Sequence, residues 1–83
     1  MPELFLFDAD GFQLASVTEF VPIYSGPDGV VAFTVTVKST EPPQPGSHLC
    51  VTNTATGQTL ARFVCLRALP WEYGTIRITG KPV

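Results

Sequence analysis

The segment from Val30 to Lys38 constrains the fold most, because its side chains alternate with a period of two. Four apolar residues share one parity: Val31, Phe33, Val35 and Val37. Such alternation, rich in β-branched residues, is typical of a strand with one buried and one wetter face. We therefore predict a strand over residues 30–38 that pairs mid-sheet with residues 18–24. We expect its four apolar residues to be the most deeply buried in the domain.

Turn-forming residues divide the rest of the chain into further short apolar segments. Strands are predicted over residues 4–7, 12–21, 48–54, 58–66 and 75–80. A proline-rich, extended connection covers residues 39–47, and one short helical turn is predicted within residues 68–74. Six short antiparallel strands joined by tight turns predict an all-β fold, a small meander that forms either a barrel or a sandwich. With 83 residues, the chain is expected to form one domain spanning residues 1–83.

Turn length predicts the register of the first hairpin. With a three-residue loop, Asp8 faces Phe12 and Leu6 faces Leu14. The returning strand then meets Pro22, which has no N–H to donate to a ladder. We therefore expect this strand to end at Pro22, to bulge there, or to lie at an edge of the sheet.

The number and distribution of charged residues indicate which partners the protein can bind. Charged residues make up 14% of the chain, below the roughly 25% typical of globular domains. We interpret this as surface that is covered by a second copy or by a protein partner. The formal net charge is −2 and the five cations are scattered, whereas nucleic-acid binding requires clustered basic residues. We therefore predict no nucleic-acid binding.

The hydropathy of the chain indicates its cellular compartment. The chain has no run of 18 or more apolar residues that could span a bilayer. The Leu4–Phe7 segment is too short for the core of a signal peptide, and no basic region precedes it. We therefore expect a cytoplasmic protein without membrane association.

The hairpin formed by residues 48–66 holds the single histidine and both cysteines. With a three-residue loop, Cys50 faces Arg62 on the wetter face, while Cys65 lies on the core face. A four-residue loop would bring Cys50 and Cys65 diagonal to each other, where a disulfide could form in an oxidising compartment. We favour the shorter loop and interpret Cys65 as a small buried hydrophobe.

Few residues suggest catalytic or metal chemistry. His48 and Cys50 share a strand face and could supply a base and a nucleophile, with Arg62 favouring the thiolate. Two cysteines and one histidine are too few for a structural zinc site. The Asp8–Gly11 segment has the spacing that opens a calcium loop, but the residues after it offer no oxygen ligands, so we interpret it as a hairpin turn. We predict no catalytic residue, no metal site and no cofactor.

Tyr24, Trp71 and Tyr73 are the large amphipathic aromatic residues and our candidate binding residues. Trp71 and Tyr73 lie between Pro70 and Gly74, outside the regular strands, where binding loops tend to occur. If exposed, they could anchor a protein partner or stack on a sugar or base. We favour the alternative that Trp71 plugs one end of the barrel.

Two functional classes follow from these observations. The first is a non-enzymatic interaction or assembly module that self-associates through sheet edges or an apolar face. The alternative is a domain that binds a small ligand, such as a sugar, through its loop aromatics. A thiol-dependent enzyme using His48 and Cys50 ranks third. The Pro42–Pro45 segment fits a PxxP ligand, but it lacks an adjacent basic residue and is interpreted as a spacer.

Overall fold

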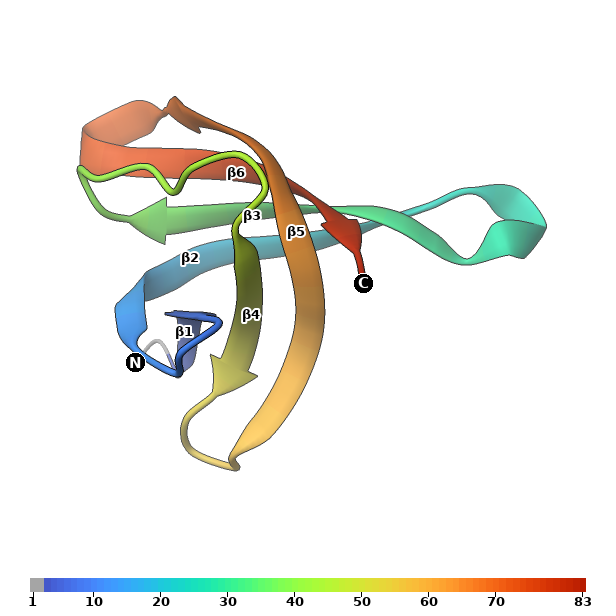
Figure 1. Ribbon diagram of the computed structural model, residues 1–83, viewed down its shortest axis with the longest axis horizontal. Helices are drawn as coiled ribbons and strands as arrows, with labels where there is room; N and C mark the ends of the chain where they lie inside the picture. The colour runs from blue at the N-terminus through green and yellow to red at the C-terminus, as the bar shows by residue number, and fades with distance from the viewer. Residues whose placement is uncertain (1–2) are drawn as a thin grey trace.

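The computed structural model describes residues 3–83 and shows a closed barrel of six antiparallel strands (Figure 1). The strands are β1 (Leu4–Asp8), β2 (Gln13–Tyr24), β3 (Val30–Lys38), β4 (His48–Asn53), β5 (Gln58–Pro70) and β6 (Thr75–Pro82). They follow the order β1-β2-β3-β6-β5-β4 around the barrel, and pairing of β1 with β4 closes it. The predicted all-β meander is confirmed, and the barrel rather than the sandwich is formed. No helix within residues 3–83 is long and apolar enough to cross a membrane.

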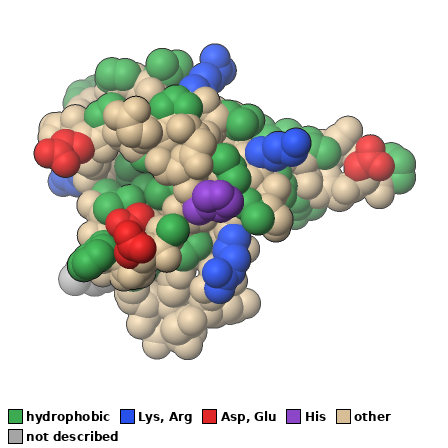
Figure 2. Space-filling view, in the orientation of Figure 1, with side chains coloured by type: hydrophobic (Ala, Val, Ile, Leu, Met, Phe, Trp, Pro, Cys, Tyr) green, Lys and Arg blue, Asp and Glu red, His purple; other side chains and the backbone are tan. Residues whose placement is uncertain are grey.

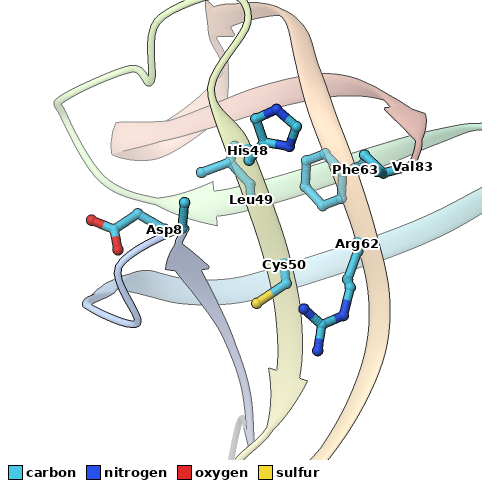
Figure 3. A pocket seen from close by; sticks show the side chains of 8 residues that line it. Asp8, His48, Leu49, Cys50, Arg62, Phe63 and Val83 are labelled. Atoms are coloured by element: carbon cyan, nitrogen blue, oxygen red, sulfur yellow. The ribbon is translucent and has the colours of Figure 1, made fainter.

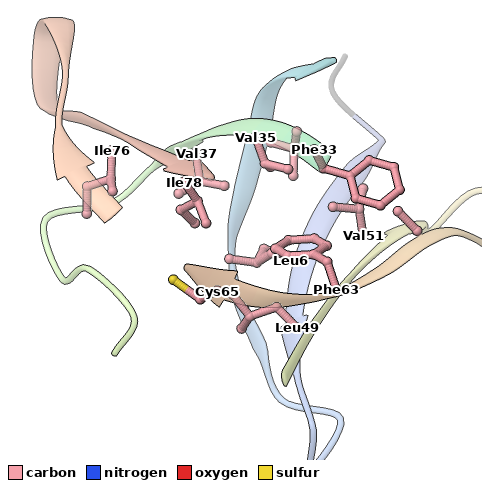
Figure 4. Close-up of a cluster of buried hydrophobic side chains, with 12 residues drawn as sticks. Leu6, Phe33, Val35, Val37, Leu49, Val51, Phe63, Cys65, Ile76 and Ile78 are labelled. Atoms are coloured by element: carbon pink, nitrogen blue, oxygen red, sulfur yellow. The ribbon is translucent and has the colours of Figure 1, made fainter. Parts of the chain in front are cut away.

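The core lies inside the barrel and receives apolar side chains from all six strands (Figure 4). Phe63 of β5 is fully buried, and its ring centroid lies 5.9 Å from that of Phe33. Phe33 in turn stacks on Phe20 of β2 at 5.5 Å. Gly80 of β6 also faces Phe63, and it leaves the space that the aromatic ring occupies. A row of three aromatic rings therefore runs from the fully buried Phe63 to the partly buried Phe20.

The predicted bounds of β3 are confirmed, and the strand lies between β2 and β6. Val35 and Val37 are among the most deeply buried residues, as expected, whereas Phe33 is buried less deeply, at 8% exposure. The same expectation is wrong for Val31, whose side chain is 41% exposed. The reason is that β6 pairs with β3 only from Phe33 onward, so Val31 lies beyond the end of the barrel.

Beyond this point β2 and β3 continue as a two-stranded ribbon, residues 21–32, which we call the arm. The 3₁₀ turn η1 (Gly26–Asp28) forms its tip, and the arm projects to the right in Figure 1. β1 pairs with β2 only up to Ser16, so each strand of the arm has one neighbour. Pro22 lies in the arm opposite Phe33. At this position β2 pairs with β3 alone, so the missing N–H of Pro22 interrupts no hydrogen bonds to another strand. Of the three expectations for Pro22, the edge position is therefore observed.

Within residues 3–83, five β-bulges interrupt the pairing, four in the barrel and one in the arm, and each leaves one residue without a cross-strand partner. These residues are Leu14, Thr18, Val31, Leu60 and Leu66. The bulge at Leu14 makes Leu6 pair with Ala15, so the predicted pairing of Leu6 with Leu14 is wrong. The bulge at Thr18 reverses the parity of β2, which lets both Val17 and Phe20 contact the core. Extra residues of this kind increase local twist and curvature, which a closed barrel needs.

Candidate functional site

The three candidate binding aromatics do not come together in the structure. Tyr24 lies on the arm next to its tip, opposite Val30. Trp71 and Tyr73 lie at the connection between β5 and β6, which includes the 3₁₀ turn η2 (Glu72–Gly74). Figure 1 shows this connection at the left end of the molecule and the arm at the right. Trp71 and Tyr73 therefore belong to one candidate site, and Tyr24 belongs to another surface.

A cavity of about 270 Å³ lies beside Trp71 on the outside of the barrel. We call it the Trp71 cavity. Its lining combines Trp71 and Tyr73 with Arg77, two glutamates and three threonines from β2, β3, β6 and η2. Glu19, Thr36 and Arg77 form one row across three neighbouring strands, on the face opposite to the buried residues. The pairing of β2, β3 and β6 therefore places these three side chains next to one another at the base of the cavity.

Trp71 does not plug the barrel, and that prediction is wrong. Its indole is 47% exposed, and the guanidinium carbon of Arg77 lies 3.9 Å from the centroid of the indole ring. An Arg77 amino nitrogen also lies 3.4 Å from Oε1 of Glu19. The barrel interior is already filled by side chains of the strands. The indole therefore lies outside, where it gains a cation–π contact with Arg77.

Tyr73 adopts a left-handed backbone conformation with φ 52° and ψ 46°. It is the sole residue other than glycine with positive φ within residues 3–83. This conformation costs an L-residue about 1–2 kcal/mol. The Tyr73 side chain is 94% exposed, so packing against the barrel does not offset that cost. Strain that persists without a packing benefit is found preferentially at functional sites.

Two buried polar atoms beside the cavity have no hydrogen-bond partner. They are Oγ1 of Thr36 and Nε of Arg77, which belong to residues that face each other across β3 and β6. Thr36 is 6% exposed, although it lies on the outward face of the sheet. A buried polar atom without a partner costs about 1–3 kcal/mol. These two atoms therefore favour a polar group that would pair with them.

A second cavity, of about 370 Å³, brings together His48, Cys50 and Arg62 (Figure 3). The Cys50 sulfur points away from the His48 ring in this view, and Sγ contacts Oγ1 of Thr52 at 3.9 Å. The geometry thus provides no activated pair of thiol and imidazole.

Asp8 also lines this second cavity, but its carboxylate is used within a turn. Oδ1 of Asp8 accepts hydrogen bonds from the backbone N–H groups of Asp10 and Phe12, both at 2.9 Å. These contacts are those of a hairpin turn, as predicted for this segment. Within residues 3–83, no three His, Cys, Asp or Glu side chains cluster as metal ligands.

Comparison with known proteins identifies no family for this chain. No protein-family model, curated protein or solved structure matches the chain. The function must therefore be inferred from the residues and their geometry.

The hairpin that holds both cysteines differs from its prediction in one detail. Asn53 pairs with Gln58, so the loop has four residues rather than three. The bulge at Leu60 compensates for the extra residue, and Cys50 faces Arg62 as predicted. The two cysteines are consequently free, with Cys50 partly exposed and Cys65 buried in the core.

The two thiols are expected to differ in reactivity. Burial raises the pKa of the Cys65 thiol above its usual range, so less of the reactive thiolate is present at any given pH. Iodoacetamide at pH 8 should therefore label Cys50 in the native protein and label both cysteines after denaturation. Mass spectrometry of the peptides measures this. Labelling of Cys65 at the rate of Cys50 in the native protein would contradict the buried position of Cys65.

Proposed function

We propose that this protein is a non-enzymatic assembly module that forms a dimer with a second copy through its arm. The observation that supports this is the apolar surface of the arm. Val21, Ile23 and Tyr24 of β2 are large, exposed hydrophobic residues. Between Phe20 and Val37 the chain carries one charged residue, Asp28 at the tip. Figure 2 shows hydrophobic side chains along the arm and an acidic group close to its end.

The arm has physical reasons to require a partner. An isolated two-stranded ribbon is at best marginally stable in water. Strands with only one neighbour also present unpaired backbone groups at their outer edges. The rest of the sheet is closed into a barrel, and among the described strands the arm is where two paired strands both lack a second neighbour. Covering the arm would stabilise it and remove apolar surface from water.

A second copy suits the arm because identical apolar surfaces can meet across a two-fold axis. Val21 and Ile23 lie on one face of the ribbon, opposite Thr34 and Ala32 respectively. Within residues 21–32 this face carries no charge that would repel the same face of another copy, and Glu19, the preceding residue of β2 on this face, is paired with Arg77. Pro22 removes one backbone donor from β2, which disfavours continuous edge-to-edge pairing. We therefore propose contact through the face of the arm that holds Val21 and Ile23.

The double variant Val21→Lys with Ile23→Lys tests this proposal. Full burial of a valine or isoleucine side chain contributes about 1.5–3 kcal/mol, so covering Val21 and Ile23, which are 43% and 42% exposed, should contribute on the order of 1–2 kcal/mol for the pair. Association should therefore weaken by about tenfold, since 1.4 kcal/mol corresponds to one decade. Size-exclusion chromatography with light scattering should give twice the single-chain mass of 9.0 kDa for the wild type, and 9.0 kDa for the double variant.

Leu60→Lys is the matched control. Leu60 is 40% exposed and Ile23 is 42% exposed, but Leu60 lies on β5 of the barrel. This variant should keep the mass of the wild type. A wild-type protein that remains at 9.0 kDa at every concentration would contradict the proposal, and so would equal dissociation by Leu60→Lys and the arm variant.

We also propose that the protein acts in the cytoplasm. The support for this comes from the two cysteines, which are free and lie on opposite sides of the sheet. Such an arrangement needs no oxidising compartment for its stability.

A further inference from the structure

We propose that the Trp71 cavity binds one neutral sugar ring, a function separate from self-association through the arm. The size of the cavity supports a small ligand. Its volume of about 270 Å³ lies just below the range of about 300–1,000 Å³ that is usual for drug-sized ligands. The cavity lies on the outside of the sheet, where Glu19 of its lining precedes Val21 of the arm by two residues on the same face of β2. A ligand can therefore enter without disturbing the core.

The aromatic residues supply the apolar part of the recognition. Trp71 and Tyr73 both have amphipathic rings, which can pack on the C–H face of a sugar while their polar groups reach its hydroxyls. Tyr73 is fully exposed and is held in a strained left-handed conformation. Its neighbour Gly74 adopts a similar positive φ of 73° without this strain. A contact between the Tyr73 ring and a ligand would offset the cost of this conformation.

The polar residues favour hydroxyl groups as partners. Nε of Arg77 can only donate a hydrogen bond, whereas Oγ1 of Thr36 can donate and accept. Both atoms are buried beside the cavity without a partner. A sugar hydroxyl also donates and accepts, so one hydroxyl between Thr36 and Arg77 would pair with both after a small shift of the Arg77 side chain. The ion pair between Glu19 and Arg77, at 3.4 Å, lies at the surface. Because surface ion pairs are weak, this contact permits such a shift.

The charges lining the cavity favour a neutral ligand. Glu19 and Glu72 contribute two negative charges, and Arg77 contributes one positive charge. The net negative charge would repel a carboxylate or a phosphate on the ligand. We therefore infer a neutral sugar rather than an acidic or phosphorylated one.

The fluorescence of Trp71 gives a direct test, because it is the only tryptophan of the chain. The probes are the methyl glycosides of glucose, galactose, mannose and N-acetylglucosamine, with glucuronate as the acidic comparison. We expect a saturable change in Trp71 emission with at least one neutral glycoside and a weaker response to glucuronate. A response to none of the four neutral probes, or a tighter response to glucuronate, would overturn the inference.

Two variants then locate the binding. Tyr73→Gly removes the aromatic ring and relieves the strained conformation, so its melting temperature should equal or exceed that of the wild type. Its affinity for the responding glycoside should fall by at least about tenfold, the effect of losing roughly 1.4 kcal/mol of contact. Thr36→Val keeps the shape of the side chain, removes the hydroxyl, and should also weaken binding.

Tyr24→Ala is the control, because Tyr24 is a second exposed tyrosine at the opposite end of the molecule. Its affinity for the glycoside should equal that of the wild type. Affinity that is unchanged in both Tyr73→Gly and Thr36→Val would show that the sugar binds elsewhere and would overturn the assignment of this cavity.

Discussion

The Phe33→Ala variant is expected to lose about 3–5 kcal/mol of unfolding free energy, the usual cost of truncating a buried phenylalanine. Phe33 is buried at 8% exposure, and its ring contacts those of both Phe20 and Phe63. Removing the ring would open a cavity between β2 and β5, which the closed barrel cannot collapse to fill. For a small domain near the low end of about 5–15 kcal/mol in stability, such a loss leaves little folded protein.

Urea unfolding followed by circular dichroism measures this loss, and Val31→Ala is the matched control. Val31 has the same sequence parity as Phe33 and lies two residues away, but it lies on the arm and is largely exposed. Its truncation should cost less than about 1 kcal/mol, as expected for a surface position. Losses of equal size in the two variants would show that the core does not end at Phe33.

Gly80→Ala is expected to have the second-largest effect, at the upper end of the roughly 1–3 kcal/mol that overpacking costs, or beyond it. A methyl group at Gly80 would lie 2.2 Å from Cδ2 and 2.9 Å from Cγ of Phe63. Phe63 is fully buried, so its ring cannot move aside freely. Gly80 does not have a positive φ, so the loss comes from the clash with Phe63 and not from the backbone.

A double-mutant cycle with Phe63→Leu separates this clash from a general loss of stability. The smaller leucine side chain leaves room for the methyl group of Gly80→Ala. The double variant should therefore lose less stability than the sum of the two single variants, by an interaction energy of about 0.5–3 kcal/mol. Strictly additive losses would contradict a direct contact between residues 63 and 80.

Much of the barrel could be predicted from alternation and turn residues. The bounds of β3 follow from a period of two and from turn chemistry. Cys50 faces Arg62 as predicted only because the bulge at Leu60 offsets the fourth residue of the loop. The extra residues Leu14 and Leu60 could not be placed in this way. A bulge is decided by the hydrogen-bond geometry of two strands and by the curvature of the closed sheet, neither of which a single strand reveals.

The candidate site was predictable only in part. Trp71 and Tyr73 stand out because they are large aromatics between Pro70 and Gly74. Arg77, Glu19 and Thr36 were missed as members of the same site, since their approach depends on the register of three strands. The alternating polar residues of β3 and β6 were the available signal, but alternation indicates a wetter face and does not indicate what covers it.

The bulges bear on how this protein could be made more soluble. Of the five bulged residues, all but Thr18 are exposed large hydrophobics. Val31 lies on the arm, whereas Leu14, Leu60 and Leu66 lie at bulges of the barrel. Polar replacements at these three positions should reduce non-specific association without changing the core. Val21 and Ile23 are exposed although they pair regularly with β3. The exposed residues at the barrel bulges therefore form one group, and the apolar face of the arm stands apart from it.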